Sequence, residues 1–163
     1  MKKNNKGFML AELVIVSAVV IGTMVALYTG FNKASINYKE RSKYYSIDCL
    51  YAGQTIKNLL IDEFKLTDLL NNTENYIDIN EYCKSVGESS AFNQYCQAVY
   101  KRYNIDKMYL VKYNKENINL LKQNNDVALE KYLNILLKSI EEDNTYRIII
   151  KDKKDYFANL KVV

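Results

Sequence analysis

After a lysine-rich start, this chain of 163 residues reads Lys6-Gly7-Phe8-Met9-Leu10-Ala11-Glu12-Leu13, and it then stays apolar as far as Phe31. The stretch 8–31 contains a single charged residue, Glu12. As a helix, these 24 residues would extend about 36 Å, which is more than the roughly 30 Å of a bilayer's hydrocarbon core. The stretch has no polar face of the kind that a soluble amphipathic helix shows. We therefore predict a membrane-spanning helix over residues 8–31.

Three kinds of N-terminal segment could account for this stretch. A secretory signal peptide has an apolar region of only about 7–15 residues and ends in a small-x-small site, whereas this run is longer and residues 25–30 offer no good site. A plain single-pass anchor leaves Glu12 unexplained, because an acidic residue inside the bilayer costs up to about 3 kcal/mol. Lysines and an arginine flank both ends of the run, so the positive-inside rule barely orients it.

The third kind of segment accounts for Glu12. The string from Lys6 to Leu13 resembles the cleavage and methylation motif of type IV prepilins and pseudopilins, in which a short basic leader ends in glycine and a glutamate stands fifth in the mature chain. The resemblance implies that a prepilin peptidase cuts between Gly7 and Phe8 and that Phe8 is N-methylated. It departs from the usual family pattern at Met9 and Ala11, and neither residue touches the cleavage site or the carboxylate.

Cleavage at this place has an electrostatic consequence. It creates a positive amine at Phe8, and in an apolar environment both this amine and Glu12 need a partner of opposite charge. The two residues are four apart and can meet within one helix. In the pilin family, the glutamate is thought to reach the amine of a neighbouring subunit instead. Glu12 is therefore the residue that we expect to direct assembly.

The resemblance also implies partners and a location. The partners are the prepilin peptidase, other pilin or pseudopilin subunits, an inner-membrane assembly platform and membrane lipid. The subunit would sit in the cytoplasmic membrane with its head outside, and then in a pilus-like or type II secretion-like filament at the cell surface, in the role of a minor subunit. Whether such a filament serves adhesion, motility, secretion or DNA uptake stays open. The alternative is a single-pass membrane-anchored extracellular binding module that does not polymerise.

The composition argues against an enzyme. The chain contains no histidine, which excludes Ser-His-Asp and Cys-His catalysis as well as histidine metal ligands. It contains neither of the glycine-rich phosphate-binding motifs, so we expect no catalytic site, no cofactor and no metal. The net charge of +4 falls to 20 basic against 19 acidic residues once a leader carrying Lys2, Lys3 and Lys6 is removed, and it does not indicate a nucleic-acid-binding protein.

Beyond the apolar run, the pattern predicts that the helix continues without a break. Apolar residues follow a 4-3-4-3 spacing at Tyr45, Cys49, Ala52, Ile56 and Leu59, which is typical of one face of a helix. The predicted organisation is thus a leader (1–7), a transmembrane or filament-core helix (8–31), its amphipathic continuation (32–62) and a globular head (63–163).

The head is predicted to be α+β. Helices are expected over 91–103, with Tyr95 on its apolar side, and from Asp126 to about 140, where Asp126 caps the helix and its apolar face includes Leu129 and Leu133. Strands are expected over 108–113, 145–151 and 156–162, the last two forming a hairpin around a turn at 152–155. These elements predict a long helix packed on a small head with an antiparallel sheet of about three strands.

Two further features of the head suggest specific chemistry. Cys83 and Cys96 enclose a short loop and would form a disulfide in an oxidising compartment, although reduced thiols that only fill space fit the sequence equally well. Tyrosines and basic residues also alternate between residues 100 and 115, a pattern that suits base stacking and phosphate contacts in DNA. The weaker prediction of DNA contact rests on Lys101, Arg102, Tyr103 and Lys107.

Overall fold

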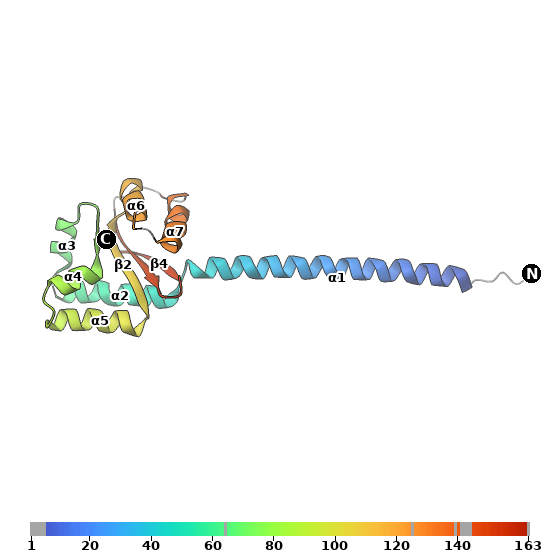
Figure 1. Cartoon of the computed structure of the whole chain (residues 1–163), viewed down its shortest axis with the longest axis horizontal. Helices are drawn as coiled ribbons and strands as arrows, with labels where there is room; N and C mark the ends of the chain where they lie inside the picture. The colour runs from blue at the N-terminus through green and yellow to red at the C-terminus, as the bar shows by residue number, and fades with distance from the viewer. Residues whose placement is uncertain (1–5, 64, 125, 139, 141–144, 163) are drawn as a thin grey trace, which may run out of the picture. The chain divides into compact units, whose positions relative to one another are not determined.

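The computed structural model describes residues 6–63, 65–124, 126–138, 140 and 145–162 of the chain (Figure 1). It divides into two compact units, one reaching to Arg41 and the other beginning at Ser42. The first unit consists of most of helix α1 (Lys6–Lys43), and the second forms the head. The predicted α+β class is confirmed, with a long N-terminal helical region followed by a small head that contains an antiparallel sheet.

The helical region is not continuous as predicted, because α1 ends at Lys43 and α2 (Ile47–Asp62) begins after an interruption at residues 44–46. Ser46 is extended at φ −70° and ψ 122°, and its side chain accepts a hydrogen bond from the Cys49 N–H at 3.2 Å. Its own N–H donates to the carbonyl of Phe157 at 2.8 Å. Ser46 therefore starts a new helix instead of continuing the first one, and the predicted segment 32–62 is shared between α1 and α2.

The sheet has four strands in the order β1-β2-β3-β4, and each neighbouring pair is antiparallel. Strand β2 (Ile105–Lys112), β3 (Tyr146–Asp152) and β4 (Phe157–Lys161) correspond to the three predicted strands. The fourth strand, β1 (Tyr76–Asp78), was not predicted, and it lies at the edge of the sheet next to β2. Its three residues are too few to show the alternation from which a strand is predicted.

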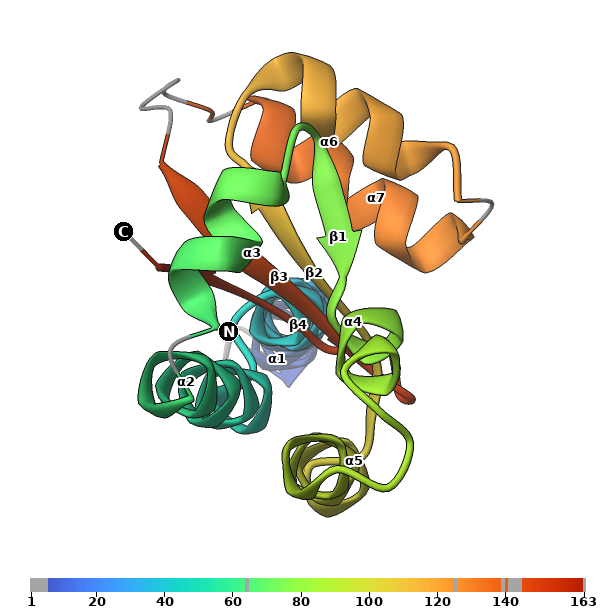
Figure 2. The ribbon, with the colours of Figure 1, turned by 90° about the vertical axis from the view of Figure 1, so that its left-hand side faces the viewer.

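Helices cover both faces of this sheet (Figure 2). One face packs against α2, α4 (Ile79–Ser85) and α5 (Ala91–Arg102), with Ile148 and Ile150 of β3 in the shared core. The short helix α3 (Leu66–Asn72) adds Leu69 to the same core. The opposite face packs against α6 (Lys115–Lys122) and α7 (Val127–Lys138) around Ile149. Neighbouring residues of β3 therefore point to two separate cores, as strand geometry requires.

Of the predicted amphipathic segment 32–62, the part that forms α2 packs closely on the sheet, whereas residues 32–43 are exposed. Cys49, Ala52, Ile56 and Leu60 of α2 are fully buried. Gly53 lies so near the sheet that a Cβ at this position would come within 2.8 Å of Ile150 Cδ1. Tyr45 was predicted on the buried face and is instead 78% exposed, because it precedes the start of α2.

Candidate functional site

The residues of the motif lie at the beginning of α1. Gly7 and Phe8 are in its first turn, and Glu12 follows Phe8 by four residues. Glu12 is exposed, as is every other side chain from Met9 to Lys43. This is the one helix in the described part of the chain that is long and apolar enough to cross a membrane. The exposed apolar surface of such a helix requires either lipid or other protein around it.

The serine and threonine hydroxyl groups within the apolar run are satisfied inside the helix. Ser17 Oγ donates to the Val14 carbonyl at 2.9 Å, and Thr23 Oγ1 donates to the Val20 carbonyl at 2.8 Å. Thr29 Oγ1 does the same with the carbonyls of the preceding turn. These side chains therefore bring no unsatisfied donor into an apolar environment. Glu12 is the single charged side chain in the run, and its charge needs a partner of opposite sign.

Small residues occupy every fourth position along one side of α1, at Ala18, Gly22, Ala26, Gly30 and Ala34. Apart from the adjoining residues and the backbone of the same helix turns, no described atom lies within 4 Å of where a Cβ of Gly22 or Gly30 would sit. Spacing of this kind allows the backbones of two membrane helices to approach closely. This spacing favours close packing against another helix as the explanation for the glycines at positions 22 and 30.

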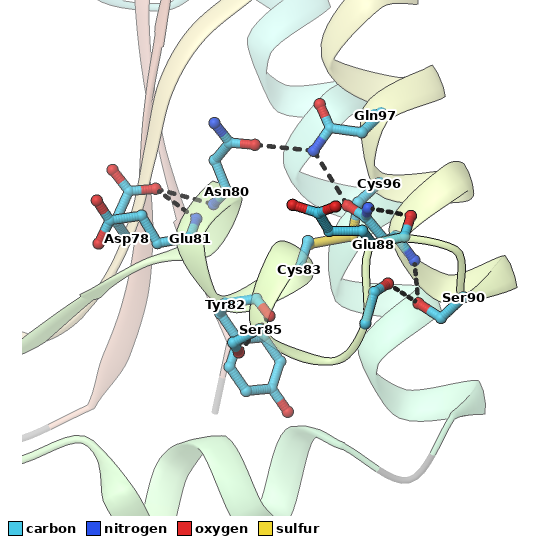
Figure 3. The surroundings of a disulfide bond; sticks show 12 residues. Asp78, Asn80, Glu81, Tyr82, Cys83, Ser85, Glu88, Ser90, Cys96 and Gln97 are labelled. Atoms are coloured by element: carbon cyan, nitrogen blue, oxygen red, sulfur yellow. Dashed lines mark hydrogen bonds between the residues drawn. A yellow bond between two sulfur atoms is a disulfide. The ribbon is translucent and has the colours of Figure 1, made fainter.

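The predicted cysteine pair forms a disulfide in the structure, with the two Cα atoms 6.3 Å apart (Figure 3). It joins α4 to α5, and a hydrogen bond from Gln97 Nε2 to Asn80 Oδ1 at 2.9 Å connects the same two helices. The remaining cysteine, Cys49, is fully buried in α2, and burial raises the pKa of its thiol to about 11. Cys49 is thus a packing residue with little thiolate at neutral pH.

The predicted DNA-contacting residues lie at the end of α5, with Lys101, Arg102 and the C-cap Tyr103, and on β2, with Lys107. The rings that alternate with them, Tyr100, Tyr109 and Tyr113, are buried, and they belong to two different cores. Lys107 Nζ is paired with Asp126 Oδ2 at 3.3 Å. Lys101 and Arg102 are exposed at the end of α5, where the Arg102 guanidinium lies 5.5 Å from the centre of the half-buried Tyr103 ring. DNA contact remains a prediction, and this arrangement leaves only a small exposed surface for it.

A cluster of charges in the head was not predicted from the sequence. Lys151 of β3 is nearly buried, and its amine lies 2.7 Å from Asp126 Oδ2, 3.1 Å from Asp155 Oδ1 and 3.4 Å from Asp106 Oδ2. Asp126 Oδ1 caps α7, as predicted, by accepting from the N–H groups of Ala128 and Leu129. This charge cluster (Asp106, Asp126, Lys151 and Asp155) ties β2, β3 and α7 together.

Ionisation in this charge cluster is determined by pairing. Burial alone would raise the pKa of Asp126, but the hydrogen bonds from Lys151, from the Leu129 N–H and from Lys107 bring it down to about 2. Burial likewise opposes the charge on Lys151, and its carboxylate partners raise its pKa well above the ordinary value. Both groups stay charged at neutral pH, so the lysine amine is held as an ammonium and is not a nucleophile.

Metal binding and binding grooves are the remaining features of the described residues that bear on function. No group of three or more His, Cys, Asp or Glu side chains in that part of the chain is placed to hold a metal ion. A groove of about 270 Å³ between α2 and α5 is lined by apolar side chains, including Leu59 and Val99. A wider groove of about 510 Å³ runs along β1 and α4.

Comparisons with protein families, with characterised proteins and with solved structures found no significant match to the chain.

Proposed function

We propose that this protein is a structural subunit, of the minor pilin or pseudopilin type, in a filament resembling a type IV pilus or a type II secretion pseudopilus. Its precursor enters the cytoplasmic membrane through α1, and a prepilin peptidase removes residues 1–7 and methylates Phe8. The subunit then joins other subunits through the apolar part of α1, with the head outside the membrane.

One observation carries this proposal, namely the position of Glu12. It is the single charge between residues 8 and 31, it is exposed, and it lies one helical turn beyond the residue that would carry the new amine. A plain anchor has no use for a carboxylate at this depth. Pairing with an amine on a neighbouring subunit neutralises both charges and also determines the axial step between subunits.

The remainder of α1 supports the same proposal. Its apolar side chains are all exposed from Met9 to Phe31, so they are available to lipid before assembly and to other helices afterwards. The small residues from Ala18 to Ala34 offer a side on which a second helix can pack at short range. This region of α1 belongs to the compact unit that ends at Arg41, and we infer that other subunits bury it on assembly.

The first experiment measures the mass of the N-terminal peptide of the protein purified from cells that assemble such filaments. We expect a chain that begins with methylated Phe8. An intact leader would contradict the proposal and favour the alternative, a membrane-anchored extracellular binding module that does not polymerise. A Gly7→Leu variant is the matched control, because it keeps the apolar helix and should retain the leader.

The second experiment tests assembly through Glu12→Ala. The variant should still be inserted and cleaved, but it should be lost from filaments, because removal of one partner of a buried ion pair costs about 3–5 kcal/mol. Glu12→Gln should also fail, since it keeps the shape and removes the charge, and Glu12→Asp should be partly active. Incorporation of Glu12→Ala at the wild-type level would contradict the pairing argument.

A further inference from the structure

The outer edge of the sheet at β1 is not paired with any described strand. In the ladder between β1 and β2, the Lys112 N–H donates to the Asn75 carbonyl at 3.3 Å, and Ile77 lies opposite Leu110. Because hydrogen-bonded residues alternate along an antiparallel strand, the intervening residues Tyr76 and Asp78 direct their backbone groups away from β2. Asp78 is also the N-cap of α4, so its carbonyl accepts the first hydrogen bond of that helix, which leaves its N–H and both backbone groups of Tyr76 at the edge. β1 is the last strand on this side of the sheet.

A groove lies beside this edge. Its volume is about 510 Å³, and Tyr76, Ile77 and Asp78 of the β1 edge together with Glu81, Tyr82 and Ser85 of α4 line it. The disulfide between Cys83 and Cys96 and the hydrogen bond between Asn80 and Gln97 fix α4 against α5. One wall of the groove is therefore held in place by a covalent bond (Figure 3).

The charge of the groove has one sign. Asp78 Oδ1 caps α4 by accepting from the N–H groups of Asn80 and Glu81, at 2.8 and 3.3 Å. Within the described part of the chain, neither Asp78 nor Glu81 is paired with a lysine or arginine. Burial, and to a lesser extent the negative charge of Asp68, raise the pKa of Tyr82, which lines the groove. The Asp68 carboxylate therefore adds to the negative potential of the groove. Such a site attracts a cationic partner.

We propose that the β1 edge binds an extended, lysine- or arginine-containing segment of another protein, which adds a fifth strand to the sheet. Main-chain hydrogen bonds to both backbone groups of Tyr76 and to the N–H of Asp78 hold the segment, and its basic side chains pair with the carboxylates of Asp78 and Glu81. In strand addition of this kind, main-chain hydrogen bonds provide the affinity, and contacts with every second side chain of the added strand provide the specificity. The site is separate from α1, so the proposal does not depend on assembly into a filament.

The experiment uses the full chain in nanodiscs of zwitterionic phosphatidylcholine, which do not attract a cationic probe. The probe is a short, end-capped peptide of alternating lysine and valine carrying a fluorophore, and the matched control peptide has glutamate in place of lysine. We expect saturable binding of the lysine peptide, seen as anisotropy, and none of the glutamate peptide. The double variant Asp78→Asn, Glu81→Gln should weaken binding by about fivefold to tenfold, since each exposed ion pair contributes little alone.

These substitutions leave the structure in place, because asparagine caps a helix about as well as aspartate does. Glu130→Gln, an exposed position on α7, is the matched control and should bind normally. Hydrogen exchange should show that the peptide protects the segment containing Tyr76 and Asp78 but not β4. Equal binding of both peptides, protection elsewhere, or protection of β1 in assembled protein without any peptide would overturn the proposal, the last by showing that a second copy of the chain fills the edge.

Discussion

Helix α1 and the head differ in where their apolar side chains lie: those of α1 are exposed, and most of those in the head are buried. From Met9 to Phe31, α1 leaves every side chain exposed, whereas the head buries residues such as Ile149 and Ile150 completely on the two faces of one sheet. The head therefore supplies its own apolar environment, and α1 depends on one supplied from outside. Stability measured on the head should accordingly be insensitive to changes in α1, and assembly should depend on α1.

The strongest test of this contrast compares matched truncations in the two regions. Ile150→Ala should lower the head's free energy of unfolding by about 2–5 kcal/mol, because it leaves a cavity under α2. Val20→Ala in α1 should change that free energy by less than about 0.5 kcal/mol. Chemical denaturation of the full chain in detergent, followed by near-ultraviolet circular dichroism, measures both. If Ile150→Ala does not fold, Ile150→Val should cost about 0.5–1.5 kcal/mol. A loss of head stability in Val20→Ala would break the comparison.

The disulfide comes next in expected effect. The double variant Cys83→Ala, Cys96→Ala should be destabilised by about 3 kcal/mol, because the bond closes a loop with a sequence separation of 13 residues. A reducing agent should lower the melting temperature of the wild-type head and leave that of the double variant unchanged. A melting temperature that does not respond to reduction in the wild type would contradict this expectation.

The charge cluster predicts a pH dependence. A carboxyl group whose pKa is lowered on folding stabilises the protein above its unfolded pKa, near 4, and loses that contribution as the pH falls towards the folded value of about 2. Asp126→Asn should therefore cost about 1–2 kcal/mol at neutral pH and almost nothing near pH 2, with the helix cap retained. Denaturation at several pH values measures the difference, with Glu130→Gln as control. A cost that does not vary with pH would show that the charge is not responsible.

The smallest effect is expected at Gly53. Alanine favours a helix by about 1 kcal/mol over glycine, but its Cβ would lie 2.8 Å from Ile150 Cδ1, so the two contributions nearly cancel. Gly53→Ala should shift the free energy of unfolding by less than about 1 kcal/mol, while Gly53→Leu should be strongly destabilising. Gly22→Ala in α1, where no described atom lies nearby, should leave the head unchanged. Tolerance of Gly53→Leu would contradict the close packing of α2 on the sheet.

Periodic patterns in the sequence predict most of the head. The alternation of Tyr146, Ile148 and Ile150 correctly assigns one face of β3, and the 3.6-residue pattern around Leu129 and Leu133 correctly assigns the buried face of α7. Periodicity indicates the direction of a side chain but not how far a neighbouring element extends over it. Tyr95 was predicted on the buried side of its helix and is 62% exposed for this reason.

Features that depend on tertiary contact escaped prediction. The pairing of Lys151 with Asp126 joins residues 25 positions apart and has no local signal. Helix α6 and strand β1 are short, and the break at Ser46 depends on a hydrogen bond to Phe157, a distant residue. Glu12 shows the reverse situation, because the sequence alone singles it out and the structure of one chain adds only its exposure.

The short connection between α1 and α2 has a mechanical consequence. In the proposed function, a force along α1 would reach the head near Ser46, whose N–H is bonded to Phe157 at the beginning of β4. β4 is in turn paired along its length with β3, the strand between the two cores. The hydrogen bond between Ser46 and Phe157 thus joins the start of α2 directly to the sheet, so a force on the proposed tether would act on β4 as well as on the first turn of α2.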